Sequence, residues 1–384
     1  MPVWRLPDYV TDVLPAEARK LERLRRQALD EFESCGFQLV QPPLLEYLDS
    51  LLTGTGKELD LQTFKLVDQL SGKTLGLRAD MTAQTARIDA HLLNHSGVTR
   101  LAYCGPVLHT RPRSATATRE PLSLGAELYG YAGVQADLEC IGLLLSCLRR
   151  LGIEGLILSL SHASVLRNLL LAHGIGEDLG SRIADCLHAK DCSALAELDL
   201  PEAAFFDLSA LIQLSGPPSH VFGLAESMTA RHPHLTEAFE QLQLVVNQFS
   251  DEIPIIMDIA DSHGYQYHTG ITFAVLKSGV ATTLARGGRY DTVGKLFGRC
   301  RPATGFSTDL RELAQYVPDL PKPQAVTTRW HASKSWREAV DVLREAGQIV
   351  VVRFPEEIAL LDEEFNFQFQ LIEKDNRWQV VAID

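Results

Sequence analysis

The segments R-L-A-Y-C-G-P-V-L-H (Arg100–His109) and S-L-G-A-E-L-Y-G-Y (Ser123–Tyr131) alternate apolar residues with small or polar ones, a pattern typical of strands. The stretch between them, T-R-P-R-S-A-T-A-T-R-E-P (110–121), contains three arginines and four hydroxyl residues. We predict two antiparallel strands joined by this loop. Because the loop is longer than most hairpin connections, its length indicates a functional or a disordered segment.

Toward the amino terminus, an amphipathic helix is expected to begin at Pro15 and to end before Gly36, with apolar residues spaced along one face. A short strand follows and leads into Pro42-Pro43, which favours a sheet edge or an interface because proline cannot donate to a ladder. Residues 73–78 form a further predicted strand. The next helix then starts with Asp80 or Thr82 available as its cap.

Toward the carboxyl terminus, a helix over 137–151 and a strand after Gly152 precede a segment, residues 163–250, whose pattern is almost entirely helical. Strands resume at 253–261, then as a pair joined by K-S-G (277–279) and ending in a tight turn at Gly287-Gly288, and again before the helix D-L-R-E-L-A. The proline-rich stretch 317–324 predicts a linker. We expect a core over 1–316 with a helical insertion at about 163–250, and a small α/β domain over 325–384. The last two strands of that domain are predicted to form a hairpin that turns at Asp375-Asn376.

Composition restricts the class of protein. The 384 residues are 46% hydrophobic and 22% charged, as in ordinary globular chains, and the formal net charge of -13 disfavours broad attraction to nucleic acid or anionic membranes. The seven cysteines are scattered and none is spaced as C-x-x-C, which favours reduced, cytoplasmic cysteine over disulfides or a zinc site. We identify no signal peptide, membrane span or metal motif, and expect no cofactor.

Six short motifs carry a resemblance. In chain order they are G-F-Q-L-V-Q-P-P-L-L-E, L-R-A-D-M-T-A-Q, Y-C-G-P-V-L-H with A-E-L-Y-G, Y-H-T-G-I-T-F, G-G-R-Y-D and A-T-G-F. Their order and spacing resemble the catalytic core of a histidyl-tRNA synthetase over roughly residues 5–315. The resemblance implies an α+β, class II synthetase-like fold: a mostly antiparallel sheet flanked by helices, with a helical insertion, that dimerises through the first motif.

In that family the loop over 110–121 closes over ATP, and arginines hold its phosphates. At the matching positions this chain has His109, His263 and Glu312. A carboxylate in place of a cation changes attraction into repulsion, and each unit pair about 4 Å apart is worth roughly 4 kcal/mol at an effective dielectric near 20. We therefore expect a degraded ATP site and no catalytic residues. Arg311, next to Glu312, points about 100° away on a helix.

The amino-acid pocket is better preserved. The family's contacts to histidine correspond to Asp80, Thr82, Glu127, Tyr267 and His268, with Arg119 or Arg289 available for the ligand's carboxylate. Two carboxylates suit an α-amino group and an imidazole N–H, through charge-assisted hydrogen bonds.

Each assignment has a simpler alternative. Asp80 is equally placed to cap a helix, Glu127 to be a buried, backbone-bonded carboxylate, and His263 and His268 to be satisfied polar groups. Tyr267 and Tyr290 suit packing as well as contact. The arginine loop itself, with Arg111, Arg113 and Arg119, is also compatible with a solvated segment without a ligand.

The carboxy-terminal segment is shorter than the anticodon-binding domain of synthetases, so no tRNA partner is expected. A synthetase-like core with a degraded ATP site resembles the regulatory subunits of ATP phosphoribosyltransferase, which act in histidine biosynthesis. That resemblance implies a self-dimer, a hetero-octamer with the short-form catalytic subunit, and L-histidine as effector. The alternatives are a divergent histidyl-tRNA synthetase that uses Arg111 or Arg311, and a freestanding histidine sensor.

Overall fold

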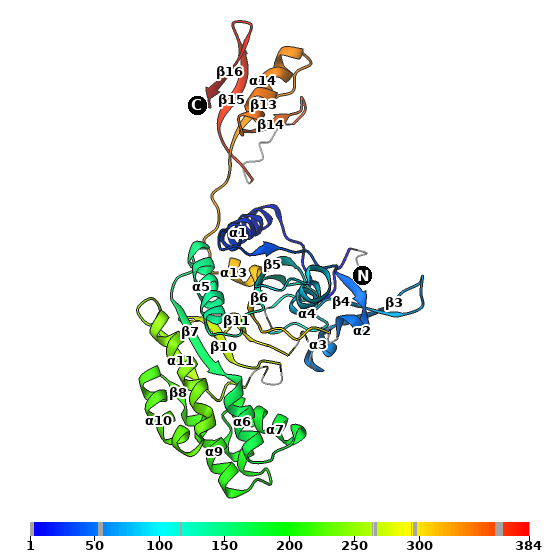
Figure 1. Cartoon of the computed structure of the whole chain (residues 1–384). Coiled ribbons are helices and arrows are strands. Elements are labelled where there is room, and N and C mark those ends of the chain that lie inside the picture. Colours follow the sequence, from blue (N-terminus) through cyan, green and yellow to red (C-terminus); the bar gives the residue numbers. More distant parts are fainter. Residues whose placement is uncertain are drawn as a thin grey trace. The chain divides into compact units, whose positions relative to one another are not determined.

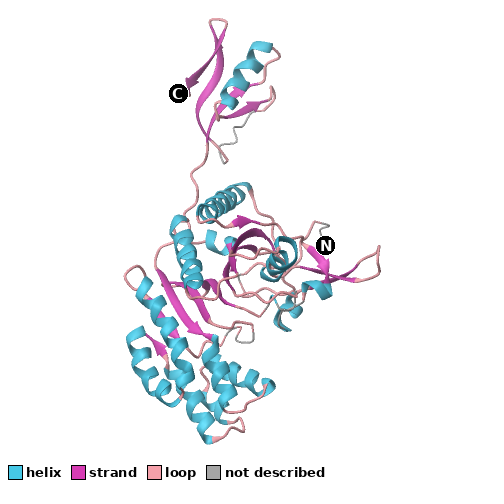
Figure 2. Ribbon diagram, in the orientation of Figure 1, coloured by secondary structure: helices cyan, strands magenta, loops and turns pink. Residues whose placement is uncertain are grey.

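The computed structural model describes residues 4–52, 57–115, 117–262, 264, 267–292, 294, 298–357 and 364–383. The chain divides into two compact units. The larger comprises Met1–Thr11 and Leu21–Val317, and the smaller comprises Asp12–Lys20 and Pro318–Asp384. Helices and strands of both units are drawn in Figures 1 and 2.

A nine-stranded sheet forms the centre of the larger unit (Figure 1). Its strands, in spatial order, are β1 (Gln38–Leu39), β5 (Thr99–Pro106), β6 (Leu122–Tyr129), β12 (Ala303–Asp309), β11 (Thr283–Arg289), β10 (Ile271–Lys277), β7 (Leu156–His162), β9 (Ile255–Asp258) and β8 (Ser215–Gly216). Only β1–β5 and β7–β9 pair in parallel among these described strands. The predicted α+β fold with a mostly antiparallel sheet is therefore confirmed.

The two strands that flank the arginine loop pair as the sequence predicts. β5 and β6 run antiparallel with Leu101 opposite Glu127. Strand β1 lies at the edge of the sheet, just before the two prolines that cannot continue a ladder.

Helices cover the sheet. Helix α1 (Pro15–Ser34) buries its apolar face and ends before Gly36, whose φ of +82° suits a residue without a Cβ. Helix α5 (Gln135–Arg150) packs against β6 and β12, and α13 (Leu310–Ala314) packs against the same two strands. The apolar periodicity of these segments is thus explained by burial against the sheet.

The glycine pair Gly287-Gly288 corrects one prediction. The sequence analysis places it at a tight turn that ends a strand, whereas both residues lie inside β11. A Cβ on Gly287 would lie 2.4 Å from the Gly305 oxygen, and a Cβ on Gly288 would lie 2.8 Å from Cδ2 of His268. These glycines are strand residues because their neighbours leave no room for side chains.

Most of the segment between β7 and β9 is helical. It contains α6 (Ala163–Ala172), α7 (Glu177–His188), α8 (Cys192–Ala196), α9 (Glu202–Gln213), α10 (Pro218–Arg231), a 3-10 turn (Pro233–Leu235) and α11 (Thr236–Phe249). These helices, green in Figure 1, gather beside β7, β8 and β9, and α11 packs on β7 and β10. Within the described ranges, no helix has the length and apolar character needed to cross a bilayer.

A second sheet of three strands precedes the arginine loop. It consists of β2 (Leu45–Tyr47), β4 (Thr74–Leu77) and β3 (Phe64–Val67), with α2 (Leu48–Leu51), α3 (Lys57–Gln62), α4 (Thr82–Arg87) and the π-helix η1 (Ile88–Leu93) around it. Arg78, directly after β4, is 5% exposed and donates to the carbonyls of Pro42 and Pro106 at 2.6 and 2.9 Å. Its own backbone pairs with Leu44 and Leu108.

The smaller unit contains a four-stranded sheet in the order β14 (Ile349–Arg353), β13 (Gln324–Arg329), β15 (Asn366–Lys374) and β16 (Arg377–Ala382). Helix α14 (Lys334–Glu345) contributes Trp336 and Val340 to its core. Strands β15 and β16 form the predicted hairpin, whose turn residues Asp375 and Asn376 have φ of +53° and +58°. Those angles are the ones a two-residue type I′ turn requires.

Candidate functional site

Glu127 lies at the centre of the larger unit, on β6. Its side chain is 1% exposed, and its carboxylate accepts hydrogen bonds from the hydroxyls of Tyr103, at 3.2 Å, and Tyr290. The opposite residue on β12 is Gly305, where a Cβ would lie 1.7 Å from Oε2 of Glu127. A glycine is needed there because the carboxylate occupies the space above it.

Glu127 takes part in none of the ion pairs that join described residues. Burial raises the pKa of this carboxyl to about 8, opposed by the hydrogen bond from Tyr290 and reinforced by the negative charge of Asp80. The group therefore holds a proton at neutral pH, and a cationic ligand would favour its release.

Asp80 and Thr82 lie beside Glu127, between the end of β4 and the start of α4. The Thr82 backbone N–H donates to Oδ1 of Asp80 at 2.6 Å, whereas the cap position of α4 is occupied by Met81. The Thr82 hydroxyl lies 3.3 Å from that of Tyr103, which donates to Glu127. Asp80 is half-buried and has a second carboxylate oxygen with which to meet a ligand.

Four tyrosines surround the carboxylates. The Tyr290 ring stacks on Tyr267 with centroids 5.2 Å apart, and the Tyr290 hydroxyl lies 3.5 Å from that of Tyr129. Burial, followed by the charge of Glu127, raises the pKa of Tyr103, Tyr129, Tyr267 and Tyr290 well above the ordinary value. All four phenols are neutral, and those of Tyr103 and Tyr290 donate hydrogen bonds to Glu127.

Tyr103 and Tyr129 are contacts that the sequence analysis does not name. A signal for Tyr129 was present, because residues 127 and 129 of one strand point to the same face. Tyr103 lies on β5 opposite Gly125, where a Cβ would be 2.5 Å from the Tyr103 ring. Its contact with Glu127 depends on the register of β5 against β6, which the sequence alone does not reveal.

His268 lies next to the cluster. Its ring meets the Tyr267 ring edge-on, with centroids 5.2 Å apart, and lies above Gly288. Its backbone oxygen accepts a hydrogen bond of 2.5 Å from Arg167 of α6, which fixes this stretch to the helical segment. His263 lies outside the described residues.

His109 is part of the protein core. The side chain is fully buried, and Nε2 lies 2.9 Å from the carbonyl oxygen of Ala79, the residue before Asp80. Burial lowers the pKa of His109, and the positive charge of Arg113 lowers it further. The imidazole is therefore neutral.

Arg119 and Arg289 differ in how fully their guanidinium nitrogens are hydrogen-bonded within the protein. Arg119 exchanges hydrogen bonds with the backbone of His109 and lies over the Phe64 ring, with the guanidinium carbon 5.0 Å from the centroid. All three nitrogens of Arg289 are bonded, to Asp137 at 2.6 and 3.1 Å and to other oxygens nearby. Arg289 is therefore a structural ion-pair residue.

Glu312 belongs to α13, whose first turn is acidic. The Asp309 carboxylate caps this helix by accepting from the backbone N–H groups of Arg311 and Leu122, at 2.9 and 3.0 Å. Burial raises the pKa of Asp309, and the negative charge of Glu312 contributes in the same direction. The guanidinium of Arg311 is already engaged, 3.5 Å from the Glu120 carboxylate in the arginine loop.

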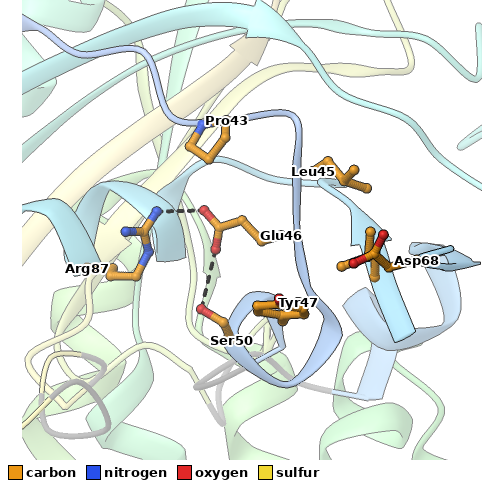
Figure 3. Close-up of a pocket in the computed structure, with 8 residues that line it drawn as sticks. Pro43, Leu45, Glu46, Tyr47, Ser50, Asp68 and Arg87 are labelled. Atoms are coloured by element: carbon orange, nitrogen blue, oxygen red, sulfur yellow. Dashed lines mark hydrogen bonds and ion pairs between the residues drawn. The ribbon is translucent and has the colours of Figure 1, made fainter. Parts of the chain in front are cut away.

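A pocket of about 400 Å³ lies apart from this cluster, beside β2 and α4 (Figure 3). Its polar wall is Glu46, which pairs with Arg87 at 2.6 Å and accepts from Ser50 at 3.4 Å. Gln84 also donates to Glu46, at 2.7 Å. None of the predicted histidine-binding residues is among those that line this pocket: Pro43, Leu45, Glu46, Tyr47, Ser50, Asp68, Leu75 and Arg87.

Comparison with known proteins gives two family matches. Residues 9–313 match a family model described as histidyl-tRNA synthetase, and residues 323–381 match one described as ATP phosphoribosyltransferase subunit HisZ C-terminal domain. The chain is 47% identical over 382 residues to an ATP phosphoribosyltransferase regulatory subunit of Paraburkholderia phymatum, which covers 99% of each chain. It is 48% identical over 388 residues to the regulatory subunit of Variovorax paradoxus, and this alignment covers 100% of each chain.

Solved structures agree with this match. A protein of Bacillus halodurans described as an ATP phosphoribosyltransferase regulatory subunit/histidyl-tRNA synthetase superposes with a TM-score of 0.79 at 25% identity, covering 95% of this chain and 97% of that one. A histidyl-tRNA synthetase of a Nostoc species gives a TM-score of 0.78 at 18% identity, with coverages of 99% and 97%, and shares the fold.

Proposed function

The chain belongs to the family of ATP phosphoribosyltransferase regulatory subunits, and from this membership we propose that it is a non-catalytic subunit that binds L-histidine. The histidine site is formed by Asp80, Thr82, Glu127, Tyr267 and His268. A sixth residue, Arg119, meets the ligand's carboxylate. Histidine bound there inhibits the partner's reaction, the first step of histidine biosynthesis.

Glu127 is the observation that carries the histidine proposal. A carboxylate that is 1% exposed and has no paired cation is costly to ionise, and a bound cation removes that cost. Asp80 adds a second negative group, which raises the pKa of Glu127 further. An α-ammonium or imidazole N–H between the two carboxyl groups satisfies both, while the stacked rings of Tyr267 and Tyr290 offer an apolar wall.

In this proposal, the chain lacks synthetase activity because of the residues that it has at three positions. His109 is a neutral core residue, and Glu312 adds a negative charge beside Asp309. The third, His263, is assigned from the sequence alone. At Glu312 a polyphosphate would meet a carboxylate where it needs a guanidinium group, a change of sign worth about 4 kcal/mol at 4 Å, and at His109 it would meet a neutral ring.

The partners are proposed on the same grounds. The names of the relatives imply a catalytic subunit, and we expect its short form, assembled with a dimer of this chain into a hetero-octamer, without tRNA. We further propose a cytoplasmic location, because all seven cysteines of the chain are unpaired, as expected in a reducing compartment.

The deciding experiment mixes the full chain with a short-form ATP phosphoribosyltransferase. We expect a stable complex, turnover that depends on this chain, and inhibition by histidine. By linkage, the factor by which histidine changes the partner's affinity for substrate equals the factor by which substrate changes this chain's affinity for histidine. The variant Glu127→Gln should assemble and restore turnover but lose inhibition, whereas the exposed control Glu226→Gln should behave as the wild type. A wild-type chain that fails to associate would contradict the proposal.

A divergent histidyl-tRNA synthetase is the second candidate, favoured by the family match over residues 9–313. It predicts exchange of pyrophosphate into ATP that depends on histidine. We expect none from the isolated chain, at any magnesium concentration, because Arg311 is paired with Glu120 and unavailable for phosphate. Exchange above the background of a boiled sample would favour the synthetase.

A further inference from the structure

Three helices of the segment between β7 and β9 bring two histidines and an aspartate together. His173 directly follows α6, Asp207 lies on α9, and His232 directly follows α10. Nε2 of His173 lies 3.0 Å, and Nε2 of His232 lies 2.7 Å, from the same oxygen of Asp207, Oδ2. These helices are labelled in Figure 1.

The geometry of the three ligand atoms suits a small divalent cation. All three lie within 4.8 Å of one another. A tetrahedral zinc ion with N and O ligands at about 2.0–2.1 Å separates its ligand atoms by roughly 3.4 Å. The observed separations from Oδ2 are a few tenths of an ångström smaller, so small side-chain rotations would open the space for an ion.

The surroundings of Asp207 have the features of a ligand site. The Asp207 side chain is 7% exposed and those of both histidines are 14% exposed, so water competes poorly. The other carboxylate oxygen, Oδ1, accepts from Arg231 at 3.2 Å, an outer contact that orients the carboxylate.

We propose that His173, Asp207 and His232 bind a zinc ion, with water as the fourth ligand, and that the ion ties α6, α9 and α10 together. Imidazole nitrogens and a carboxylate oxygen are ligands that zinc accepts, and three protein ligands leave one coordination position for solvent. The site lies outside the Glu127 cluster. It does not depend on the proposed function, and the sequence analysis contains no signal for it.

The test uses the full chain, stripped of metal by a chelator and titrated with zinc against a chromogenic competitor. We expect one equivalent to bind, and the melting temperature to rise with zinc. Asp207→Asn and His232→Gln should each weaken binding roughly tenfold or more, because even outer contacts of zinc sites are worth 10–100-fold. His220→Gln, an exposed histidine on α10, is the matched control and should bind as the wild type.

Cobalt in the wild-type chain gives a second readout that does not require the variants to fold. We expect the intense visible absorption of four-coordinate cobalt, without the near-ultraviolet charge-transfer band of a thiolate. A thiolate band would assign the metal to cysteine and overturn the proposal. So would an absence of stoichiometric binding, or zinc affinities of Asp207→Asn and His232→Gln that equal that of the wild type; the cluster would then be a hydrogen-bonded core only.

Discussion

Replacing Glu127 by glutamine removes the buried acid while keeping its shape. In the wild type, burial raises the pKa of Glu127 to about 8 from its ordinary value of 4.5. The folded chain therefore retains a proton that the unfolded chain has released over this range. By linkage, the free energy of unfolding falls as the pH rises from about 4.5 to about 8.

That pKa determines the size of two effects, the change in stability with pH and the change in histidine affinity with pH. Each tenfold change in the ionisation equilibrium is worth about 1.4 kcal/mol, so the fall in stability across the range amounts to roughly 5 kcal/mol as an upper value. At pH 7 about one Glu127 side chain in ten is ionised, and at pH 8 about one in two. If histidine needs the carboxylate, its affinity should be roughly fivefold higher at pH 8 than at pH 7, with close to one proton released at pH 7.

Calorimetric titration with histidine at pH 7 and pH 8, in two buffers of different ionisation heat, measures the affinity and the proton release together. Glu127→Gln should lose detectable binding and the pH-dependent part of the unfolding free energy, while the exposed control Glu226→Gln should retain both. Histidine binding by Glu127→Gln at wild-type strength, or wild-type binding without proton release, would refute the reasoning.

Three further substitutions test the packing around the site. Gly305→Ala places a Cβ 1.7 Å from the Glu127 carboxylate and should cost about 1–3 kcal/mol, measured by denaturant unfolding; an unchanged midpoint would mean that β12 moves freely. Arg289→Met leaves Asp137 as a buried unpaired charge and should cost about 3–5 kcal/mol at pH 7, and a loss below 1 kcal/mol would argue that Asp137 is protonated. Asp309→Ala removes the cap of α13 and should lower stability by about 0.5–2 kcal/mol, which thermal melting can detect.

Much of the fold could be predicted because local patterns determine it. The apolar face of α1, the alternation in β5 and β6, and the Asp375-Asn376 turn are each explained by neighbours within a few residues. The glycines of β11 could not be placed in this way. Their small size is imposed by Gly305 and His268 across the sheet, and a sequence does not display such cross-strand crowding.

The candidate site likewise has residues that the sequence predicts and contacts that it does not. Asp80, Thr82 and Glu127 were found from short motifs, and the structure brings them together. The hydrogen bonds of Tyr103 and Tyr290 to Glu127 join residues 24 and 163 positions apart, and depend on a sheet register that no motif states. His173 and His232 lie 34 and 25 positions from Asp207, so their convergence follows from helix packing and not from spacing.

Arg78 has a mechanical consequence. One buried guanidinium ties the carbonyls of Pro42 and Pro106 to the end of β4, two residues before Asp80. The proline segment, the end of β5 and the start of the Asp80 turn are therefore held together by one side chain. Because Pro43, next to Pro42, lines the 400 Å³ pocket, the same guanidinium connects the rim of that pocket to the Asp80 turn.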